Sequence, residues 1–174
     1  MSVTHYAFHL RMNHQKYRAA FHEVGHLVML KSWRPDKCNV ATIYYDGLWC
    51  GKILPPPNYP HSIDVAKVIV AGVVAETCYE QLNAKEVRRV FESDSRSFGG
   101  DWKNYKKNLK ATKPERIALA EMLLNEGRYY GDVVEDSGYF PYLHSACMAT
   151  FEHFGEHKMH RLAKVLYLNG KVIL

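Results

Sequence analysis

Two histidines four residues apart, with a glutamate directly after the first, form the segment of this chain with the clearest chemical potential. The segment is His22-Glu-Val-Gly-His26, and residues four apart lie on the same face of a helix. Both imidazoles can therefore bind one metal ion, while Glu23 can accept a proton from a water molecule bound to that ion. Zinc suits this arrangement because it lowers the pKa of bound water and polarises a peptide carbonyl. The pattern predicts a zinc site built for hydrolysis.

A third zinc ligand must come from elsewhere in the chain, because catalytic zinc usually has three protein ligands and one open position. Met29 and Ser32 stand where the longer metzincin pattern has glycine and histidine, which excludes that pattern. Two carboxylates are candidates. Glu76 lies in an apolar stretch, where a buried charge needs a partner. Asp101 follows two glycines at an expected helix start, where it could equally act as a cap.

The elements that would position these residues form a mainly helical domain with one β-hairpin. Apolar periodicity and end signals predict helices over about 14–33, 63–83, 101 onward, 112–125 and 141–168. Glycine at 155 is a candidate break in the last helix. The β-branched run 39–45, a turn at Asp46-Gly47 and the run 48–54 predict the hairpin, which the prolines at 55–57 would end. The polar stretch at residues 84–100, which follows the helix predicted over 63–83, predicts a loop.

Gly25, in the middle of the first predicted helix, predicts a close approach of another segment. Glycine inside a helix costs about 1 kcal/mol relative to alanine. Its presence one residue before His26 therefore suggests that something packs against the backbone there.

Composition and charge predict one globular domain spanning residues 1–174 rather than a membrane or nucleic-acid-binding protein. With 47% apolar and 24% charged residues, the chain is of ordinary globular type. Its longest apolar run, Val68–Ala75, is too short to cross a bilayer. We therefore expect no membrane partner. Four scattered cysteines indicate reduced thiols, so we expect a cytoplasmic location. The lysine-rich run Lys103–Lys113 accounts for much of the net charge of +5, and a solvated helix face is favoured over a nucleic-acid surface.

Four segments of the chain, in order, resemble the peptidase domain of the FtsH family of zinc metalloproteases. The segments are Arg18–His26, Val40–Ile43 with Gly51–Pro55, Ile69–Glu76, and Ser97–Trp102. The interval between His22 and Asp101 (101 − 22 = 79 residues) is also similar to that of the family. The resemblance covers residues 18–110 and, more faintly, the C-terminal helical part 114–174. Val24 in place of the usual alanine and Gly100 in place of a more polar residue are departures that remove no functional atom.

The resemblance implies a zinc metalloendopeptidase whose H-E-x-x-H helix lies in the core of an FtsH-like peptidase domain. It implies Asp101 as the third ligand and Glu76 as the residue that orients a ligating imidazole, with the reverse assignment as the alternative. The sequence contains no G-x-x-x-x-G-K-[ST] loop. We therefore expect a stand-alone, ATP-independent module that acts on flexible or unfolded polypeptides, or on substrates supplied by a delivery partner.

Substrate binding is expected at the second strand of the hairpin. Its residues Cys50, Gly51, Lys52 and Ile53 would bind an extended substrate through backbone hydrogen bonds. A non-catalytic, zinc-containing module that acts by capturing a partner is the alternative function.

Overall fold

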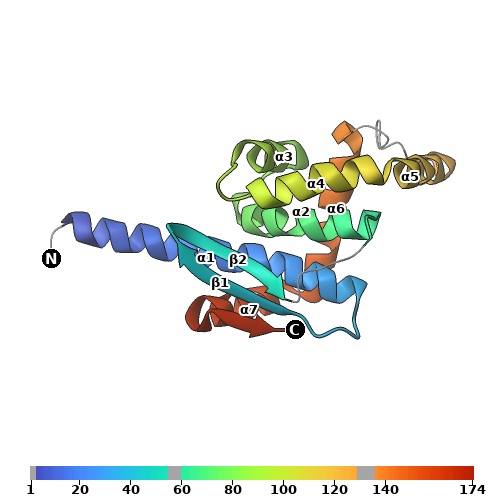
Figure 1. Ribbon diagram of the computed structural model, residues 1–174. Coiled ribbons are helices and arrows are strands. Elements are labelled where there is room, and N and C mark those ends of the chain that lie inside the picture. Colours follow the sequence, from blue (N-terminus) through green and yellow to red (C-terminus); the bar gives the residue numbers. More distant parts are fainter. Residues whose placement is uncertain (1–2, 55–59, 129–135) are drawn as a thin grey trace.

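The computed structural model of the protein describes residues 3–54, 60–128 and 136–174 (Figure 1). Over these residues the chain is mainly helical, with one small three-stranded antiparallel sheet. None of the helices described is both long enough and apolar enough to cross a membrane. The elements follow in the order α1 (Val3–Trp33), β1 (Val40–Asp46), β2 (Leu48–Leu54), α2 (Ile63–Thr77), η1 (Cys78–Glu80), α3 (Ala84–Ser93), α4 (Gly99–Ala111), α5 (Lys113–Asn125), α6 (Asp136–Phe154), α7 (Glu156–Asn169) and β3 (Lys171–Ile173).

Helix α1 lies between the sheet and α2 and is the central element of the fold (Figure 1). It begins at Val3, earlier than the expected start near residue 14, because no proline or glycine interrupts the intervening residues. Every residue from 20 to 30 is buried. The H-E-x-x-H segment therefore lies within a continuously buried stretch of α1.

Helices α1 and α2 run antiparallel and approach closely at Gly25. A Cβ added there would lie 2.4 Å from the carbonyl oxygen of Ala71 and 2.6 Å from the Cβ of Ala75. The close approach predicted from the mid-helix glycine is therefore confirmed. It brings the histidine-bearing face of α1 directly onto the backbone of α2.

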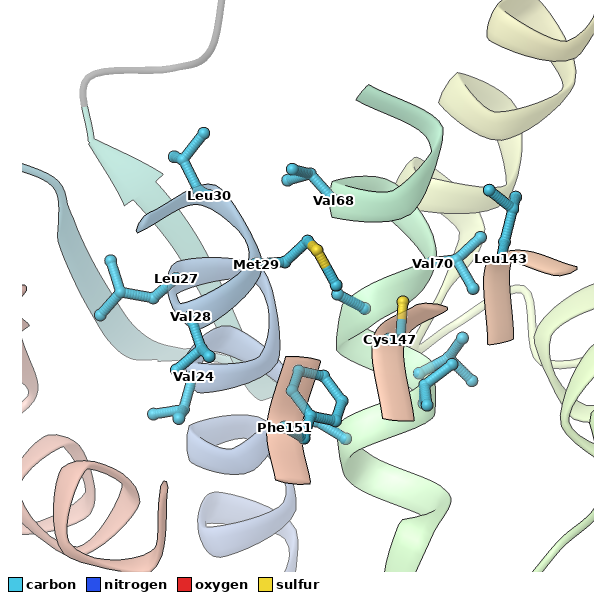
Figure 2. Close-up of a cluster of buried hydrophobic side chains, with 14 of the residues drawn as sticks. Val24, Leu27, Val28, Met29, Leu30, Val68, Val70, Leu143, Cys147 and Phe151 are labelled. Atoms are coloured by element: carbon cyan, nitrogen blue, oxygen red, sulfur yellow. The ribbon is translucent and has the colours of Figure 1, made fainter. Parts of the chain in front are cut away.

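An apolar cluster joins α1 and α2 to α6 (Figure 2). Its members in Figure 2 include Val24 and Val28 on α1, Val70 on α2, and Leu143 and Phe151 on α6. All of these side chains are buried. Burying each such side chain contributes roughly 1.5–3 kcal/mol, so the relative positions of α1 and α2 are well fixed by packing behind the site.

The sheet contains the predicted hairpin and one strand that was not predicted. Strands β1 and β2 pair antiparallel from Val40↔Leu54 to Asp46↔Leu48. The expectation of a single hairpin was incomplete, because β3 pairs with β1 on its other side and gives the strand order β2-β1-β3. Strand β3 follows Gly170, whose φ of 69° ends α7. Its three residues are too few to show an alternating pattern.

The region expected as one helix over 63–83 and a loop over 84–100 is divided differently. Helix α2 ends at Thr77, and a 3₁₀ turn leads to Gln81, whose φ of 53° is left-handed. The expected loop contains α3, which was missed. A capping box starts it: the Asn83 side chain accepts from the Glu86 backbone N–H, and the Glu86 carboxylate accepts from the Asn83 N–H. The sequence Asn83-x-x-Glu86 was the overlooked signal.

The other helices lie where the sequence predicts them, except that one of them starts earlier than expected. Helices α4 and α5 begin within two residues of their predicted starts. Gly155, with a φ of 99°, separates α6 from α7 at the candidate break. Helix α6 begins at Asp136, before the expected start at Pro141. The prolines at 55–57 lie outside the described residues.

Candidate metal centre

Three polar side-chain atoms from α1 and α4 converge on one point. The Nε2 atoms of His22 and His26 are 3.0 Å apart. The Asp101 Oδ2 atom lies 2.9 Å from the His22 Nε2 and 3.3 Å from the His26 Nε2. Residues 79 positions apart in the sequence thus form a compact triangle of one oxygen and two nitrogens.

This triangle has dimensions suited to zinc. Zinc binds histidine nitrogen and carboxylate oxygen at about 2.0–2.2 Å in tetrahedral geometry, which places neighbouring ligand atoms about 3.3–3.6 Å apart. The three observed separations span 2.9–3.3 Å. A small outward movement of the side chains would therefore accommodate the ion.

The hydrogen-bond partner of His26 leaves its Nε2 atom free to bind a cation. The Nδ1 atom lies 2.7 Å from the carbonyl oxygen of Val68, which can only accept, so Nδ1 carries the proton. In the neutral ring, Nε2 then presents a lone pair to the His22 Nε2 and to Asp101. Lone pairs converging in this way repel one another unless a proton or a metal ion lies between them. The donor set fits a metal ion on this ground as well.

One face of α2 determines how both rings are oriented. Val68, Gly72 and Glu76 are spaced four residues apart along this face and contact the rings in turn. The Val68 carbonyl accepts from the His26 Nδ1, and the Glu76 Oε2 lies 3.4 Å from the His22 Nδ1. Between them, a Cβ on Gly72 would lie only 2.5–2.6 Å from ring atoms of both histidines. The absence of a side chain at Gly72 therefore makes room for both imidazoles.

Sequence reasoning identified Glu76 on this face but missed the other two positions. The Val68 carbonyl is a backbone group, which no side-chain pattern can reveal. Gly72 was detectable in principle, because its spacing of four residues from Glu76 matches the spacing of His22 and His26.

Asp101 is positioned by an anchored turn before α4. The Asp94 carboxylate accepts from the backbone N–H of Ser97 at 3.0 Å and closes the turn. Phe98 is buried, and its ring lies 5.4 Å from that of His22, centroid to centroid. Asp101 follows in the first turn of α4. Two glycines precede it, but a Cβ on either would meet nothing within 4 Å, so packing does not explain them.

The cluster strongly attracts positive charge in the metal-free chain. Burial alone would lower the pKa of His22, but contacts with Asp101 and Glu76 outweigh it and raise that pKa well above its usual value. Burial would likewise raise the pKa of Asp101, but the charges of His26 and His22 hold it well below its usual range. The raised pKa of His22 and the lowered pKa of Asp101 favour a protonated imidazole beside an ionised carboxylate, and metal binding would release such a proton.

Glu23 lies beside the triangle rather than in it. Its side chain is buried against β2, where a Cβ on Gly51 would lie 2.2 Å from the Glu23 Cγ. Its carboxylate lies within 4.8 Å of ligand atoms of both histidines. Burial raises the pKa of Glu23, although the charges of His26 and His22 partly oppose this. A carboxylate with a raised pKa is suited to accepting a proton near neutrality.

The positions of the Asp101 and Glu76 carboxylates favour different roles for the two residues. Asp101 contacts both Nε2 atoms. Glu76 faces the other nitrogen of His22 and is therefore on the far side of the ring from the triangle. Of the two candidates for third ligand, Asp101 is the one that this geometry favours.

An open cleft of about 780 Å³ gives access to the centre. The two histidines, Glu23 and Asp101 line it, and so do the four predicted substrate-strand residues Cys50, Gly51, Lys52 and Ile53. The predicted catalytic, metal and substrate residues are thus all brought together along one cleft.

Strand β2 presents unpaired backbone groups to this cleft. The Ile43 N–H donates to the Gly170 carbonyl at 3.0 Å, so the polar backbone groups of Ile43 face β3. Its partner on the other side, Gly51, is then a non-hydrogen-bonded position whose N–H and C=O point away from β1. By the same alternation, Trp49 and Ile53 also direct their backbone groups outward. No strand within the described residues pairs with this edge.

The chain matches no protein-family model, and a search of curated proteins finds no significant match. The geometry of the cleft and of the residues that line it is therefore the basis for a functional proposal.

Proposed function

We propose that the chain is an ATP-independent zinc metalloendopeptidase with an FtsH-like peptidase domain, acting on flexible or unfolded polypeptides. The observation that carries the proposal is the convergence of His22, His26 and Asp101 next to the buried carboxylate of Glu23. A zinc ligand set, a proton acceptor and an open cleft are the parts that metal-assisted hydrolysis requires.

The protein groups would act in a defined order. Zinc held by His22, His26 and Asp101 would supply a Lewis acid that polarises the scissile carbonyl and makes water easier to deprotonate. Glu23 accepts the proton as the water oxygen attacks the carbonyl carbon. It then donates that proton to the amine nitrogen as the C–N bond breaks. Throughout, the Val68 carbonyl would hold the His26 ring by its Nδ1 atom, and Glu76 would face the Nδ1 atom of His22.

An extended substrate would bind as an additional strand along β2. Gly51 packs against Glu23 through its Cα side and lines the same cleft as the histidines, so a substrate backbone hydrogen-bonded to its outward-facing N–H and C=O would lie along the cleft that contains the metal centre. Successive N–H groups of a strand point in opposite directions. Methylating single backbone nitrogens of a peptide substrate should therefore inhibit cleavage at alternate positions only. Equal inhibition at every position would contradict strand addition.

Nucleic acid is not part of the proposal, and the arrangement of α4 supports leaving it out. The aromatic residues that are interleaved with its lysines pack onto each other, and Trp102 remains partly exposed. Tyr105 is fully buried, and the ring of Trp102 stacks on it at 5.5 Å. Lys103, Lys106, Lys107 and Lys110 are exposed, but Tyr105 offers no surface on which a base could stack, and the Trp102 ring is already contacted by Tyr105 and by the Lys106 Nζ.

Replacing Glu23 with glutamine tests the proposed function most simply. The Glu23→Gln chain should retain zinc but lose cleavage of unfolded casein, because the amide cannot accept the proton. Glu92→Gln, at an exposed position on α3, is the matched control and should cleave at the parental rate. Parental cleavage by Glu23→Gln would refute the mechanism. Zinc and casein binding by the parent without turnover would instead indicate the alternative function, partner capture by a non-catalytic module.

A further inference from the structure

We propose that Arg18 is a positioning residue of the metal centre, which acts by holding Glu76 against His22. This inference rests on the metal-binding part of the proposed function. Neither the ligand set nor the catalytic group includes Arg18. It lies on α1 one turn before His22, on the same helix face as both histidines.

Three side chains form a continuous chain of contacts from the cleft wall to the ligand. The Arg18 Nη2 pairs with the Glu76 Oε1. The other carboxylate oxygen, Oε2, lies 3.4 Å from the His22 Nδ1. One oxygen of Glu76 is thus engaged by the guanidinium while the second faces the ring. This arrangement directs the Nδ1 proton of His22 toward Glu76 and leaves Nε2 for the metal.

Burial makes Arg18 necessary for this arrangement. The Glu76 side chain is only 6% exposed, whereas that of Arg18 is 40% exposed. A carboxylate so far from water needs a partner for its charge. Without the guanidinium, the Glu76 carboxylate would turn toward water, and His22 would lose the acceptor that orients its ring.

The His22 Nδ1 atom is buried and makes no hydrogen bond, and the carboxylate oxygen that faces it is the Glu76 Oε2. At 3.4 Å the Glu76 oxygen is slightly too far for a good hydrogen bond, and this Nδ1 has no other partner. Movement of His22 by a few tenths of an ångström would close the contact. Arg18, anchored on the same helix, fixes the carboxylate at the position that the ring would meet.

The test compares zinc affinity among variants of the full chain. Arg18→Met removes the charge but keeps an apolar stem of similar length, and Arg18→Lys restores a positive charge. Arg89→Met, at an exposed position on α3, is the matched control. Dissociation constants for zinc are measured by competition with a chromophoric chelator. Urea denaturation of each metal-free chain shows whether a change in affinity reflects loss of the fold.

We expect Arg18→Met to bind zinc about 10-fold more weakly, near the lower end of the loss seen when an outer-shell partner is removed. Arg18→Lys should bind with intermediate affinity, and Arg89→Met should match the parent. Because Arg18 acts through Glu76, adding Arg18→Met to Glu76→Gln should cause little further loss. Visible absorption spectra of the Co²⁺-substituted chains should also differ between the parent and Arg18→Met.

Four outcomes would overturn the inference or separate it from the proposed function. Parental zinc affinity in Arg18→Met overturns it and leaves the peptidase proposal intact, and so do fully additive losses in the double variant. If the variants show the expected losses of zinc affinity but the parent binds zinc and cleaves nothing, the inference is supported and the peptidase proposal is refuted. A parent that binds no zinc overturns both.

Discussion

The absence of a side chain at Gly72 is the feature of α2 on which the metal centre depends most directly. In a Gly72→Ala chain, the new Cβ would lie 2.5 Å from the His26 Nε2 and 2.6 Å from the Cε1 and Nε2 of His22. Carbon and nitrogen atoms in ordinary contact are about 3.5 Å apart. One or both rings must therefore move by roughly 1 Å.

A movement of this size should affect metal binding far more than folding. Zinc sites tolerate deviations of about 0.2 Å in ligand distances, so a displacement of roughly 1 Å removes at least one ligand. We expect zinc affinity to fall at least about 100-fold, which is about 2.7 kcal/mol. In the metal-free chain, the gain of about 1 kcal/mol in helix propensity partly offsets an overpacking cost of about 1–3 kcal/mol. The net loss of folding stability should be about 0–2 kcal/mol.

Isothermal titration with zinc and urea denaturation of the metal-free chain measure these two quantities separately. Gly99→Ala is the matched control, since a Cβ at Gly99 meets nothing within 4 Å and the residue also lies in a helix. The control should bind zinc as the parent does. Parental zinc affinity in Gly72→Ala would refute the reasoning, because it would mean that the imidazoles do not occupy the space beside Gly72.

Three further predictions concern folding and metal linkage. Gly25→Ala should lower the free energy of unfolding, measured in urea, by about 1–3 kcal/mol, because the new Cβ would collide with the Ala71 carbonyl. A gain of about 1 kcal/mol would show instead that helix propensity alone determines the effect. Asn83→Ala removes the capping box with Glu86 and should lower the stability measured by thermal unfolding by about 1 kcal/mol, with zinc affinity unchanged. An unaltered melting temperature would contradict a stabilising role for the capping box. Zinc at about 1,000 times its dissociation constant should stabilise the parent by about 4 kcal/mol, reversibly on adding a chelator; equal stabilisation of His26→Ala would show that zinc binds elsewhere.

The helix that carries the histidines could be predicted because its signals are local. The four-residue spacing of His22 and His26, the apolar face around them and the glycine at 25 all lie within a few turns of one helix. The hairpin was equally accessible from its β-branched run and its Asp46-Gly47 turn. In each case, neighbouring residues carry the information.

Features that depend on contacts between distant segments were harder to predict from the sequence. Strand β3 exists because three residues after Gly170 reach the free side of β1, and so short a segment has no pattern of its own. The Val68 carbonyl orients His26 through the backbone, which leaves no trace in residue type. The pairing of Arg18 with Glu76 joins two helices, and neither helix predicts it alone.

The role of Asp101 could be predicted from the sequence only in part. Residue types alone left Asp101 and Glu76 as equal candidates for the third ligand, and only the resemblance to a known family separated them. In the structure, Asp101 contacts both Nε2 atoms while Glu76 faces the Nδ1 atom of His22. Opposite sides of one imidazole ring thus distinguish two carboxylates that look alike in the sequence.

Metal content tests the central claim most directly. The measurement is elemental analysis of protein purified without added metal, comparing the parent with Asp101→Ala and Glu76→Ala. We predict close to one zinc ion per chain in the parent, loss of that zinc in Asp101→Ala, and retention of most of it in Glu76→Ala. A parent that contains no metal and takes up none when zinc is supplied would contradict the account.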